Sequence, residues 1–511
     1  MRKTVAFLLL GLIFLPAALP AADTSKVPKR ILKANRTLIY KMLPPEVETL
    51  DDFLTKGVFY GRLRMNTFRW DWKEETPVTR DNWAAGLGAS LTYKSPCWYG
   101  FGFTLDGYTS QNPRHMDRED IPFLKAGKDA LSRHDVFANG DYQMNVMAQA
   151  YAEYRLSKTR IRWGRQKFES FLTKSNDTKM IPNTFQGVSL VSKDLPKHIF
   201  KLAWFSRQKL RDHTRFHDVL TFADGPLDGL ERTEKLVAVW SNNDDSGMHR
   251  GLSWSNYEKA GESTRHDLLV AEVWSMAAPH LKAMVNYTAV PNVLSSATGE
   301  AYYTFSLSDY IVVPGVRYMH QFDNGGGAIG GASLTGLLAS GGEDGGYNDP
   351  DSLEGWLAAA RIDVKRKEAP WRVRLAYSRV GDEADIVAPW RGFPTGGYTR
   401  AMGQYNWFAN TKTWLLRGDY DMTKAGLVPG LSLMAQVAVE DYDQDKSVIK
   451  SGNTVYLQPS DRTVLHLDAI ERFPKWPGLE ARLRMAFVDA DRVSGRDPSY
   501  NEYRFELNYL F

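Results

Sequence analysis

The sequence contains one cysteine, Cys97, among 511 residues. A single cysteine cannot form an intramolecular disulfide bond, and it excludes metal sites that need several thiolate ligands. The formal net charge is +4, which is too small for a chain of this length to indicate nucleic-acid binding. After residue 22, no stretch reaches the ~18 consecutive apolar residues that a transmembrane helix requires. The chain is therefore not expected to be a disulfide scaffold, a nucleic-acid-binding protein or a helical membrane protein.

Residues 1–22 have the composition of a secretory signal peptide. Arg2 and Lys3 form a basic start, residues 5–19 are apolar, and Ala21 or Ala22 offers a small residue for cleavage. An uncleaved anchor is the alternative, but the apolar run is near the lower limit for a membrane span. We therefore expect an exported chain in which residues 23–56 form a periplasmic segment, with one short helix, ahead of a main domain at residues 57–511.

Apolar and polar residues alternate along much of the chain from residue 57 onward. Hydrophobic residues make up 43% of the sequence, yet its mean hydropathy is negative. In residues 159–165, Arg160 and Arg162 alternate with Ile161 and Trp163. Successive side chains of a strand point to opposite faces, so the arginines share one face and the apolar residues share the other. This pattern predicts transmembrane β-strands, which meet lipid on one side and water on the other.

The connections between these segments alternate in length. Short connections lie at residues 95–98, 157–158, 193–198, 368–370 and 474–478, and long ones at 111–141, 168–183, 208–233, 323–353 and 381–403. Transmembrane barrels join their strands by short periplasmic turns and long extracellular loops. The sequence therefore predicts an all-β fold, a closed antiparallel transmembrane β-barrel of about 18 strands, although the segments permit a count of about 18 to 20.

The last segment has the clearest alternation. Tyr503, Phe505, Leu507, Tyr509 and Phe511 fall on one face, and polar residues fall on the other. A final strand that ends on an aromatic residue resembles the signal that barrel-assembly machinery recognises. We therefore expect this machinery to bind the strand ending at Phe511, and outer-membrane lipid and lipopolysaccharide to surround the barrel.

Three internal segments resemble those of a known family. They are residues 162–166 (RWGRQ) followed by 175–188 (SNDTKMIPNTFQGV), residues 389–394 (PWRGFP) with 397–400 (GYTR), and residues 420–421 (YD) with 424–431 (KAGLVPGL). Together they look like the OprD family of Gram-negative outer-membrane porins, over about residues 57–511. The resemblance implies an 18-stranded barrel with a constricted, arginine-lined pore that passes small carboxylates or amino acids. It leaves open which solute passes and whether the protein is a monomer or a trimer.

Arginines on the alternating segments are the candidate pore-lining residues. An arginine on the lipid face would cost roughly 2–4 kcal/mol near the membrane midplane, so these side chains should face the lumen. A guanidinium stays charged and matches the geometry of a carboxylate, which suits a wall that passes anions. Alternatively, the arginines only brace the wall by pairing with Glu153, Asp363, Asp419 and Glu506. The candidates are Arg62, Arg64, Arg160, Arg162, Arg372, Arg374, Arg482 and Arg484.

Two loops supply further candidates. The loop at residues 168–183 is expected to fold inward, because the matching segment of the family lies beside the constriction. Asp177 is then a candidate pore-lining carboxylate, and Arg391 and Arg400 can reach the lumen from the second family-like segment. Asp177 and its neighbours also suit an ordinary turn. The glycine-rich residues 325–346 and the pair His213 and His217 lack convincing nucleotide or metal patterns, so we expect neither metal nor cofactor.

The predicted function is passive diffusion of small polar solutes through a porin, without enzymatic activity. A barrel hydrolase is one alternative, but no nucleophile with a partner base at a recognisable spacing stands out. A structural or adhesive barrel whose pore is plugged by its long loops is the other. Nucleic acid is not an expected partner.

Overall fold

The computed structural model describes residues 30–76, 79–124, 130–220, 249–334, 346–403, 405–446, 449–451, 454–456, 459–493 and 495–511. The predicted signal peptide, residues 1–22, lies outside these ranges. No helix within them has the length and apolar character needed to cross a membrane.

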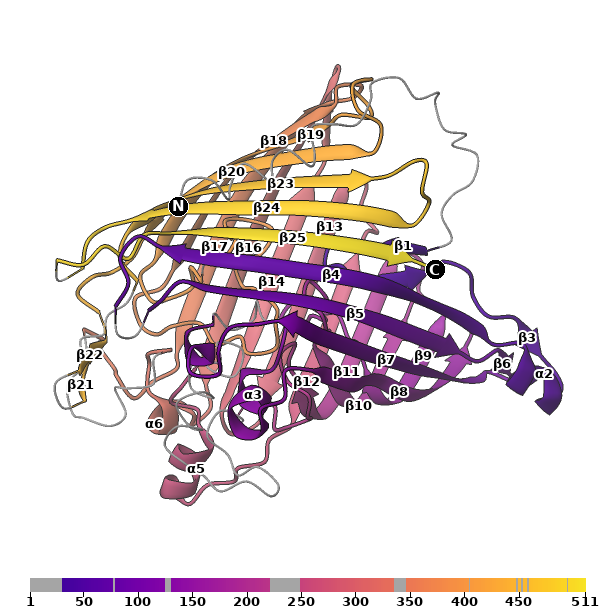
Figure 1. The fold of residues 1–511 in the computed structure, drawn as a ribbon, viewed down its shortest axis with the longest axis horizontal. Helices are drawn as coiled ribbons and strands as arrows, with labels where there is room; N and C mark the ends of the chain where they lie inside the picture. Colours follow the sequence, from indigo (N-terminus) through magenta and orange to yellow (C-terminus); the bar gives the residue numbers. More distant parts are fainter. Residues whose placement is uncertain are drawn as a thin grey trace.

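Eighteen long antiparallel strands close into a barrel within the described residues (Figure 1). The last strand, β25, pairs with the first, β4, through a continuous register from Tyr500↔Trp72 to Leu510↔Arg62. The predicted closed barrel of about 18 strands is therefore confirmed. The strands are β4 (Val58–Trp72), β5 (Asn82–Lys94), β7 (Phe101–Arg114), β8 (Met144–Leu156), β9 (Thr159–Gln166), β10 (Thr184–Ser192), β11 (His198–Lys209), β12 (Leu268–Ser275), β13 (Leu281–Val290), β14 (Leu294–Tyr303), β16 (Tyr310–Asp323), β17 (Gly355–Arg366), β18 (Trp371–Val380), β19 (Lys412–Asp421), β20 (Leu431–Asp441), β23 (Arg462–Arg472), β24 (Leu479–Ala490) and β25 (Tyr500–Leu510).

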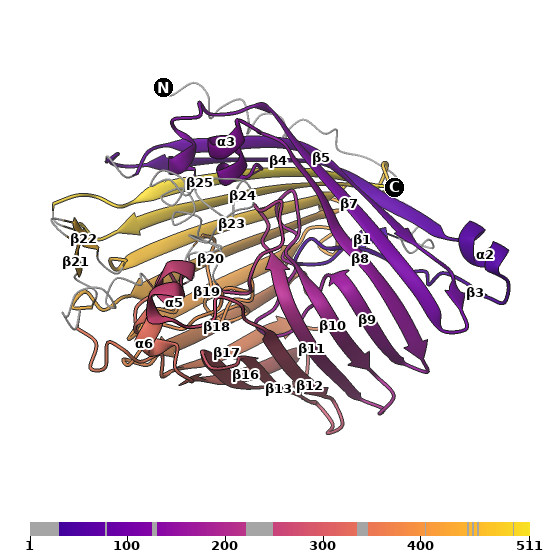
Figure 2. The same cartoon turned by 90° about the horizontal axis from the view of Figure 1, so that it is seen from below.

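The two ends of the barrel differ as the sequence predicts. The short turns and the C-terminus lie at one end, and the long connections lie at the other (Figure 1). One connection at the loop end is short, because residues 291–293 alone join β13 to β14. The loop end carries η1 (Ile121–Phe123), α3 (Arg133–Asn139), α5 (Trp254–Ala260), α6 (Gly327–Gly330) and the small sheet of β21 (Ile449–Ser451) and β22 (Thr454–Tyr456), as seen also in Figure 2.

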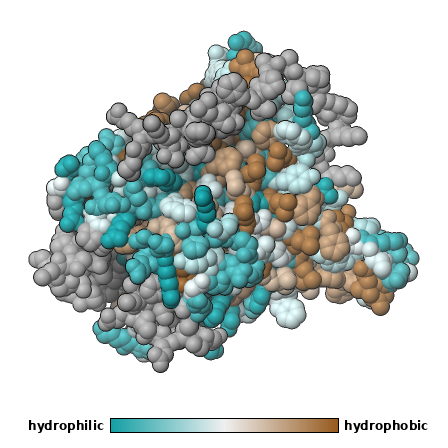
Figure 3. All heavy atoms as spheres, in the orientation of Figure 1, coloured by the Kyte–Doolittle hydropathy of each residue, from teal (hydrophilic) through white to brown (hydrophobic). Residues whose placement is uncertain are grey.

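Side chains alternate between the inside and the outside of the wall. In β9, Ile161 and Trp163 are 40% and 70% exposed, whereas Arg162 turns to the other face and pairs with Glu153. Over the strands the visible outer surface is mainly hydrophobic, and hydrophilic residues gather at the loop end (Figure 3). A closed wall with an apolar outer band satisfies every strand hydrogen bond in lipid, as a membrane barrel must.

Two short helices at the loop end begin and end on residues suited to those positions. Ser132 and Ser253 cap α3 and α5, because their hydroxyl groups accept the backbone N–H groups of Asp135 and Asn256. Each helix ends at a glycine in the left-handed region, Gly140 or Gly261. Such capping fixes both helices without a long apolar face.

Residues 30–56, ahead of the barrel, form two parts. The strands β1 (Arg30–Leu32) and β2 (Leu38–Tyr40) form a hairpin whose tip residue Arg36 is buried against the inner wall. The following residues return to the turn end, where β3 (Glu46–Val47) pairs in parallel with β6 (Cys97–Trp98). The short helix expected from the sequence is α2 (Leu50–Thr55). A further short strand, β15 (Phe305–Leu307), extends the pairing of β16.

Candidate functional site: a narrowed lumen

Two long loops meet inside the barrel. Residues 167–183 connect β9 to β10 and residues 381–411 connect β18 to β19. The backbone N–H of Lys174 donates to the Trp390 carbonyl (3.0 Å), and that of Gly392 donates to the Leu172 carbonyl (2.7 Å). A Cβ at residue 392 would lie 2.3 Å from the Leu172 backbone, so only glycine permits this approach. The two loops that carry parts of the first two family-like segments, far apart in the sequence, are therefore in direct contact.

The 167–183 loop is held to the wall through Asp177. One carboxylate oxygen of this fully buried residue forms an ion pair with Arg62, and the other lies 2.9 Å from Arg64 Nη1. The Tyr108 hydroxyl donates to the same carboxylate (3.1 Å), and Lys167 Nζ donates to Tyr108 (2.7 Å). A carboxylate between two arginines is a charge-assisted clamp that holds the loop in the lumen.

Two cavities adjoin where the loops and the hairpin tip meet. The larger has a volume of about 660 Å³ and the smaller about 320 Å³. Strands β19, β20, β23 and β24 wall the larger cavity, whereas β11 to β14 and β16 wall the smaller. Five residues line both cavities and mark the narrow region between them: Asn35, Asn176, Arg391, Phe393 and Gly396.

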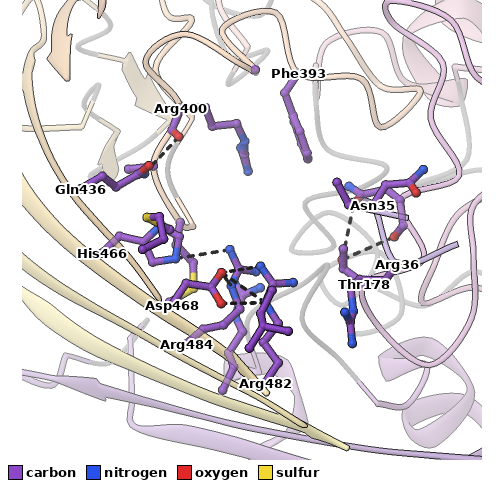
Figure 4. A pocket seen from close by; sticks show the side chains of 18 of the residues that line it. Asn35, Arg36, Thr178, Phe393, Arg400, Gln436, His466, Asp468, Arg482 and Arg484 are labelled. Atoms are coloured by element: carbon purple, nitrogen blue, oxygen red, sulfur yellow. Dashed lines mark hydrogen bonds and ion pairs between the residues drawn. The ribbon is translucent and has the colours of Figure 1, made fainter. Parts of the chain in front are cut away.

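The lining of the larger cavity is predominantly cationic, although Arg36, Arg472 and Arg504 pair with glutamates of the wall. Its described lining includes ten lysine or arginine side chains and two carboxylates, Asp419 and Asp468. Figure 4 shows Arg482, Arg484 and Asp468 on the barrel wall, across the cavity from Asn35 and Thr178. The cationic residues are Lys33, Arg36, Arg211, Arg391, Arg400, Arg417, Arg472, Arg482, Arg484 and Arg504.

The wall arginines of this cavity share carboxylates. Arg482 Nε and Arg484 Nε lie 2.9 and 3.2 Å from oxygens of Asp468. Arg372 and Arg417 likewise both pair with Asp419. Because two guanidinium groups share each carboxylate, each cluster of two arginines and one aspartate has a net charge of about +1. In the first cluster, Glu506 lies 4.0 Å from Arg482 Nη1 and offsets part of this charge.

Aromatic rings support the arginine that enters from the 381–411 loop. The guanidinium carbon of Arg400 lies 3.5 Å from the ring centre of Phe393, and it lies 5.5 and 5.4 Å from those of Tyr405 and Trp407. Cation–π contacts stabilise a guanidinium without neutralising it, so the positive charge persists beside the cavity. Arg391 of the same loop lies 5.7 Å from the Phe393 ring.

The smaller cavity has a smaller excess of positive charge, with four cationic and two anionic side chains in its described lining. Lys201 pairs with Glu272 (2.7 Å), and Arg317 pairs with Glu300. Burial lowers the pKa of Lys174, which lies on the 167–183 loop at this cavity. The opposed charges make this cavity less suited than the larger one to attract an anion by net charge.

Nine of the ten predicted pore residues fall into three environments. Arg482, Arg484 and Arg391 line the larger cavity. Arg62, Arg64 and Asp177 form the buried clamp. Arg162 pairs with Glu153, Arg374 with Asp363 and Arg372 with Asp419, which are contacts that the bracing alternative predicts. Arg160, beside Arg162 on β9, lies outside both cavities.

Several lining residues were not among the sequence candidates. Arg417 and Arg504 alternate with apolar neighbours on β19 and β25, so the period-two pattern contained the signal for both. Arg36 and Arg211 lie outside the barrel strands, where no periodic pattern exists to identify them.

The pair His213 and His217 lies buried beneath the loops. His213 Nδ1 is 3.0 Å from His217 Nε2, and burial lowers the pKa of both imidazoles. One ring donates to the other, which gives each neutral histidine a structural partner. Among the described residues, no group of three or more potential ligands is placed to hold a metal ion.

Comparison with known proteins supports this reading of the fold. The family model described as "outer membrane porin, OprD family" matches residues 68–248. No curated protein sequence matches the chain. The matching family is one of porins rather than enzymes. The resemblance predicted from residues 162–188 is therefore confirmed over this part of the chain.

Solved structures share the whole architecture. OccK9 (OpdG) of Pseudomonas aeruginosa is 17% identical with a TM-score of 0.63, covering 90% of this chain and 99% of its own. OccAB3 of Acinetobacter baumannii is 15% identical with a TM-score of 0.64, at 89% and 99% coverage. OpdK of Pseudomonas aeruginosa, solved with vanillate, is 13% identical with a TM-score of 0.60, at 89% and 98% coverage. These matches show the porin fold, and together with the family match and the apolar outer band they support an outer-membrane, multi-pass β-barrel.

Proposed function

We propose that this OprD-like outer-membrane porin passes small anions, carboxylates foremost, along the arginine-rich larger cavity. The observation that carries the proposal is the ten-to-two excess of cationic over anionic side chains around that cavity. A narrow pore selects by its width and by the charges on its wall. Several guanidinium groups at successive positions let an anion bind weakly at one and move to the next.

Monocarboxylates fit the cavity better than large or cationic solutes. A volume of about 660 Å³ holds a molecule of one or two rings together with some water. Vanillate, the aromatic carboxylate named with the OpdK structure, is therefore a suitable probe. An amino acid also carries a carboxylate, but Asp468 and Asp419 are the only described carboxylates lining this cavity to receive its ammonium group.

A planar-bilayer experiment tests the proposal. The purified protein should give discrete conducting steps, with a reversal potential that indicates anion preference under a salt gradient. Changing both Arg482 and Arg484 to alanine should reduce that reversal potential by at least half. The negative charge of Asp468 then lacks the two guanidinium groups that pair with it. The pair Arg160→Ala and Arg162→Ala is the matched comparison outside both cavities and should have a smaller effect. Equal effects of the two double variants would contradict the proposed route.

A plugged barrel is the second candidate, because loops and the N-terminal hairpin occupy much of the lumen. Liposomes that carry the protein should swell in an isosmotic solution of a small carboxylate if the pore conducts. If liposomes with protein shown to be folded swell no faster than empty liposomes, the result would favour the plugged barrel and contradict the porin function.

The proposed partners beyond the solute follow from the surface of the barrel. Outer-membrane lipid and lipopolysaccharide cover the apolar outer band, where Trp163 and Val285 are among the exposed side chains. Barrel-assembly machinery binds β25, which ends beside the terminal Phe511. Protein in detergent should show by its mass whether the barrel works alone or as a trimer.

A further inference from the structure

The β1–β2 hairpin lies in the lumen without joining the barrel sheet. Its two strands pair only with each other, through Arg30↔Tyr40, Ile31↔Ile39 and Leu32↔Leu38. Side chains and one backbone carbonyl therefore hold it in place, rather than a ladder of strand hydrogen bonds. Residues 41–57, including two consecutive prolines, connect the hairpin to β4.

Arg36 at the tip is the main attachment to the wall. Its guanidinium pairs with Glu480 of β24 and lies 3.1 Å from Glu506 of β25. Its carbonyl accepts a hydrogen bond from Arg62 Nη1 (2.8 Å), the arginine that also holds Asp177. The side chain is 2% exposed, so these charges interact with little screening by water.

The backbone at Arg36 has an unusual conformation that its contacts sustain. Its φ is +65°, in the left-handed region that glycine or asparagine adopts more easily. Such strain persists where surrounding contacts determine the conformation, and it is found preferentially at functional sites. Arginine is therefore present at a position where a small residue would fold more easily, because the long side chain reaches both glutamates.

The other tip residues contact the 167–183 loop. Asn35 Nδ2 donates to Glu169 (3.0 Å), and the hydroxyl groups of Thr37 and Ser175 lie 2.8 Å apart. Glu169 also accepts from the Ser175 hydroxyl. The tip thus rests against the loop that narrows the lumen, and Asn35 lines both cavities.

The stem of the hairpin makes a smaller apolar contact with the wall. Leu38 packs with Tyr60 and Leu510, and the rings of Tyr40 and Tyr60 stack with their centres 5.4 Å apart. The hairpin is consequently a separate body, attached through one salt-bridged tip, the hydrogen bonds of Asn35 and Thr37 to the 167–183 loop, and one small apolar patch.

We propose that the β1–β2 hairpin is a tethered plug, and that the ion pairs of Arg36 with Glu480 and Glu506 hold it across the lumen and set the width of the channel. The inference rests on the proposed porin function. When the tip is docked, Lys33, Ala34 and Asn35 form part of the cavity wall. When the ion pairs are broken, the tip leaves the wall and the two cavities merge into a wider passage.

Single-channel conductance of the full-length protein in planar bilayers measures the plug directly. Arg36→Ala removes both ion pairs and should raise conductance roughly twofold or more, with frequent switching between levels, because pore width limits conduction. Lys41→Ala is the matched control, since it removes the same charge from an exposed residue outside the hairpin. It should leave the step size unchanged.

A reversible cross-link provides the second measurement. Thr37→Cys with Ser175→Cys places two thiols where hydroxyl groups now lie 2.8 Å apart, in a Cys97→Ser background that removes the only native thiol. Combined with Arg36→Ala, the oxidised cross-link should restore the small, steady step, and reduction with dithiothreitol should return the large one. This comparison is made within one folded preparation, so a folding defect cannot imitate it.

The outcomes separate the plug from the porin. Wild type, Arg36→Ala and both redox states of the cross-linked variant could all give conducting steps of the same size. That outcome would contradict the proposal that the hairpin is a plug, and it would leave the porin function standing. Absence of conducting steps in every preparation, from protein shown to be folded, would contradict the porin function. A large step in Arg36→Ala that the oxidised cross-link reduces is the expected result.

Discussion

Arg62 and Asp177 form an ion pair in which both side chains are fully buried, although 115 positions separate them in the sequence. Arg62 belongs to the first barrel strand and Asp177 to the loop that enters the lumen. Burying two charges is costly unless each is well paired, and here Arg64 and Tyr108 complete the surroundings of the carboxylate. The pair therefore fixes a loop whose position determines the shape of both cavities.

Replacing Asp177 by alanine should release this loop. Two buried guanidinium groups would lose their shared counter-charge, and removal of one partner of a buried pair costs ~3–5 kcal/mol. We expect a lower free energy of unfolding in denaturant titrations, and proteolysis within residues 167–183 that the wild type resists. Asp309→Ala is the control, because its pair with Arg366 is at least half exposed and worth ~0–1 kcal/mol. Equal losses in the two variants would refute the clamp.

The barrel was largely predictable from the sequence because a membrane imposes a strict rule. Each strand must alternate between lipid and lumen, so Ile161 and Trp163 separate from Arg162 in the sequence as they do in space. The alternation of short turns and long loops follows from the same closed architecture. The short connection at residues 291–293 is a local exception that neighbouring strands tolerate without a change of register.

The arrangement of the lumen was less predictable, because alternation gives the face of a residue and not its neighbours. Arg62 and Arg482 have the same pattern, yet one is sealed against Asp177 and the other lines a cavity. The difference comes from a loop and a hairpin that lack periodicity. The alternation of polar and apolar residues could not identify Arg36 as a lumen residue. Its position depends on contacts with Glu480 and Glu506, which are more than 440 positions away in the sequence.

An arginine in the lipid-facing row should destabilise the barrel. Leu416 is 56% exposed on the outer face near the middle of β19, between Leu375 and Val437 of the adjacent strands. Leu416→Arg should lower the free energy of unfolding in vesicles by ~2–4 kcal/mol, because the charge meets hydrocarbon. Ser432 on β20 faces the larger cavity, so Ser432→Arg should lower the free energy of unfolding far less. If the lumen-facing variant lost as much stability, the assignment of inside and outside would be wrong.

The terminal aromatic residue should matter more for assembly than for stability. The backbones of Gly61 and Phe511 exchange two hydrogen bonds, of 2.9 and 3.1 Å, which need no side chain at residue 511. We expect Phe511→Ala to reduce the amount of folded barrel in the outer membrane of cells, while spontaneous folding into lipid vesicles changes little. Leu427→Ala, at an exposed apolar residue of another turn, is the control. Normal levels of Phe511→Ala in cells would argue against recognition of this residue.

A buried carboxylate organises the loops above the lumen. Asp385 of the 381–411 loop accepts the backbone N–H groups of Leu334 (2.6 Å) and Ala409 (2.7 Å) and the Tyr347 hydroxyl (2.8 Å). Burial raises the pKa of Asp385 to about 6, although these donors and Lys446 favour the charged form. Three loop segments therefore meet at one group that titrates in mildly acidic solution.

Stability of the folded barrel should fall as pH rises from about 4 to about 6. Asp385 has an ordinary pKa of 3.8 and a folded one near 6, so within this window the folded state binds more protons than the unfolded state. The contribution of protonated Asp385 to the free energy of unfolding is complete below about pH 4, and about 3 kcal/mol of this contribution is lost above pH 6. Thermal unfolding across this range should show the decline in wild type and a flatter profile in Asp385→Asn, whose side chain does not titrate. Glu383→Gln, two residues away and exposed, should keep the wild-type profile; a decline of the same size in Asp385→Asn would assign the pH dependence to other groups.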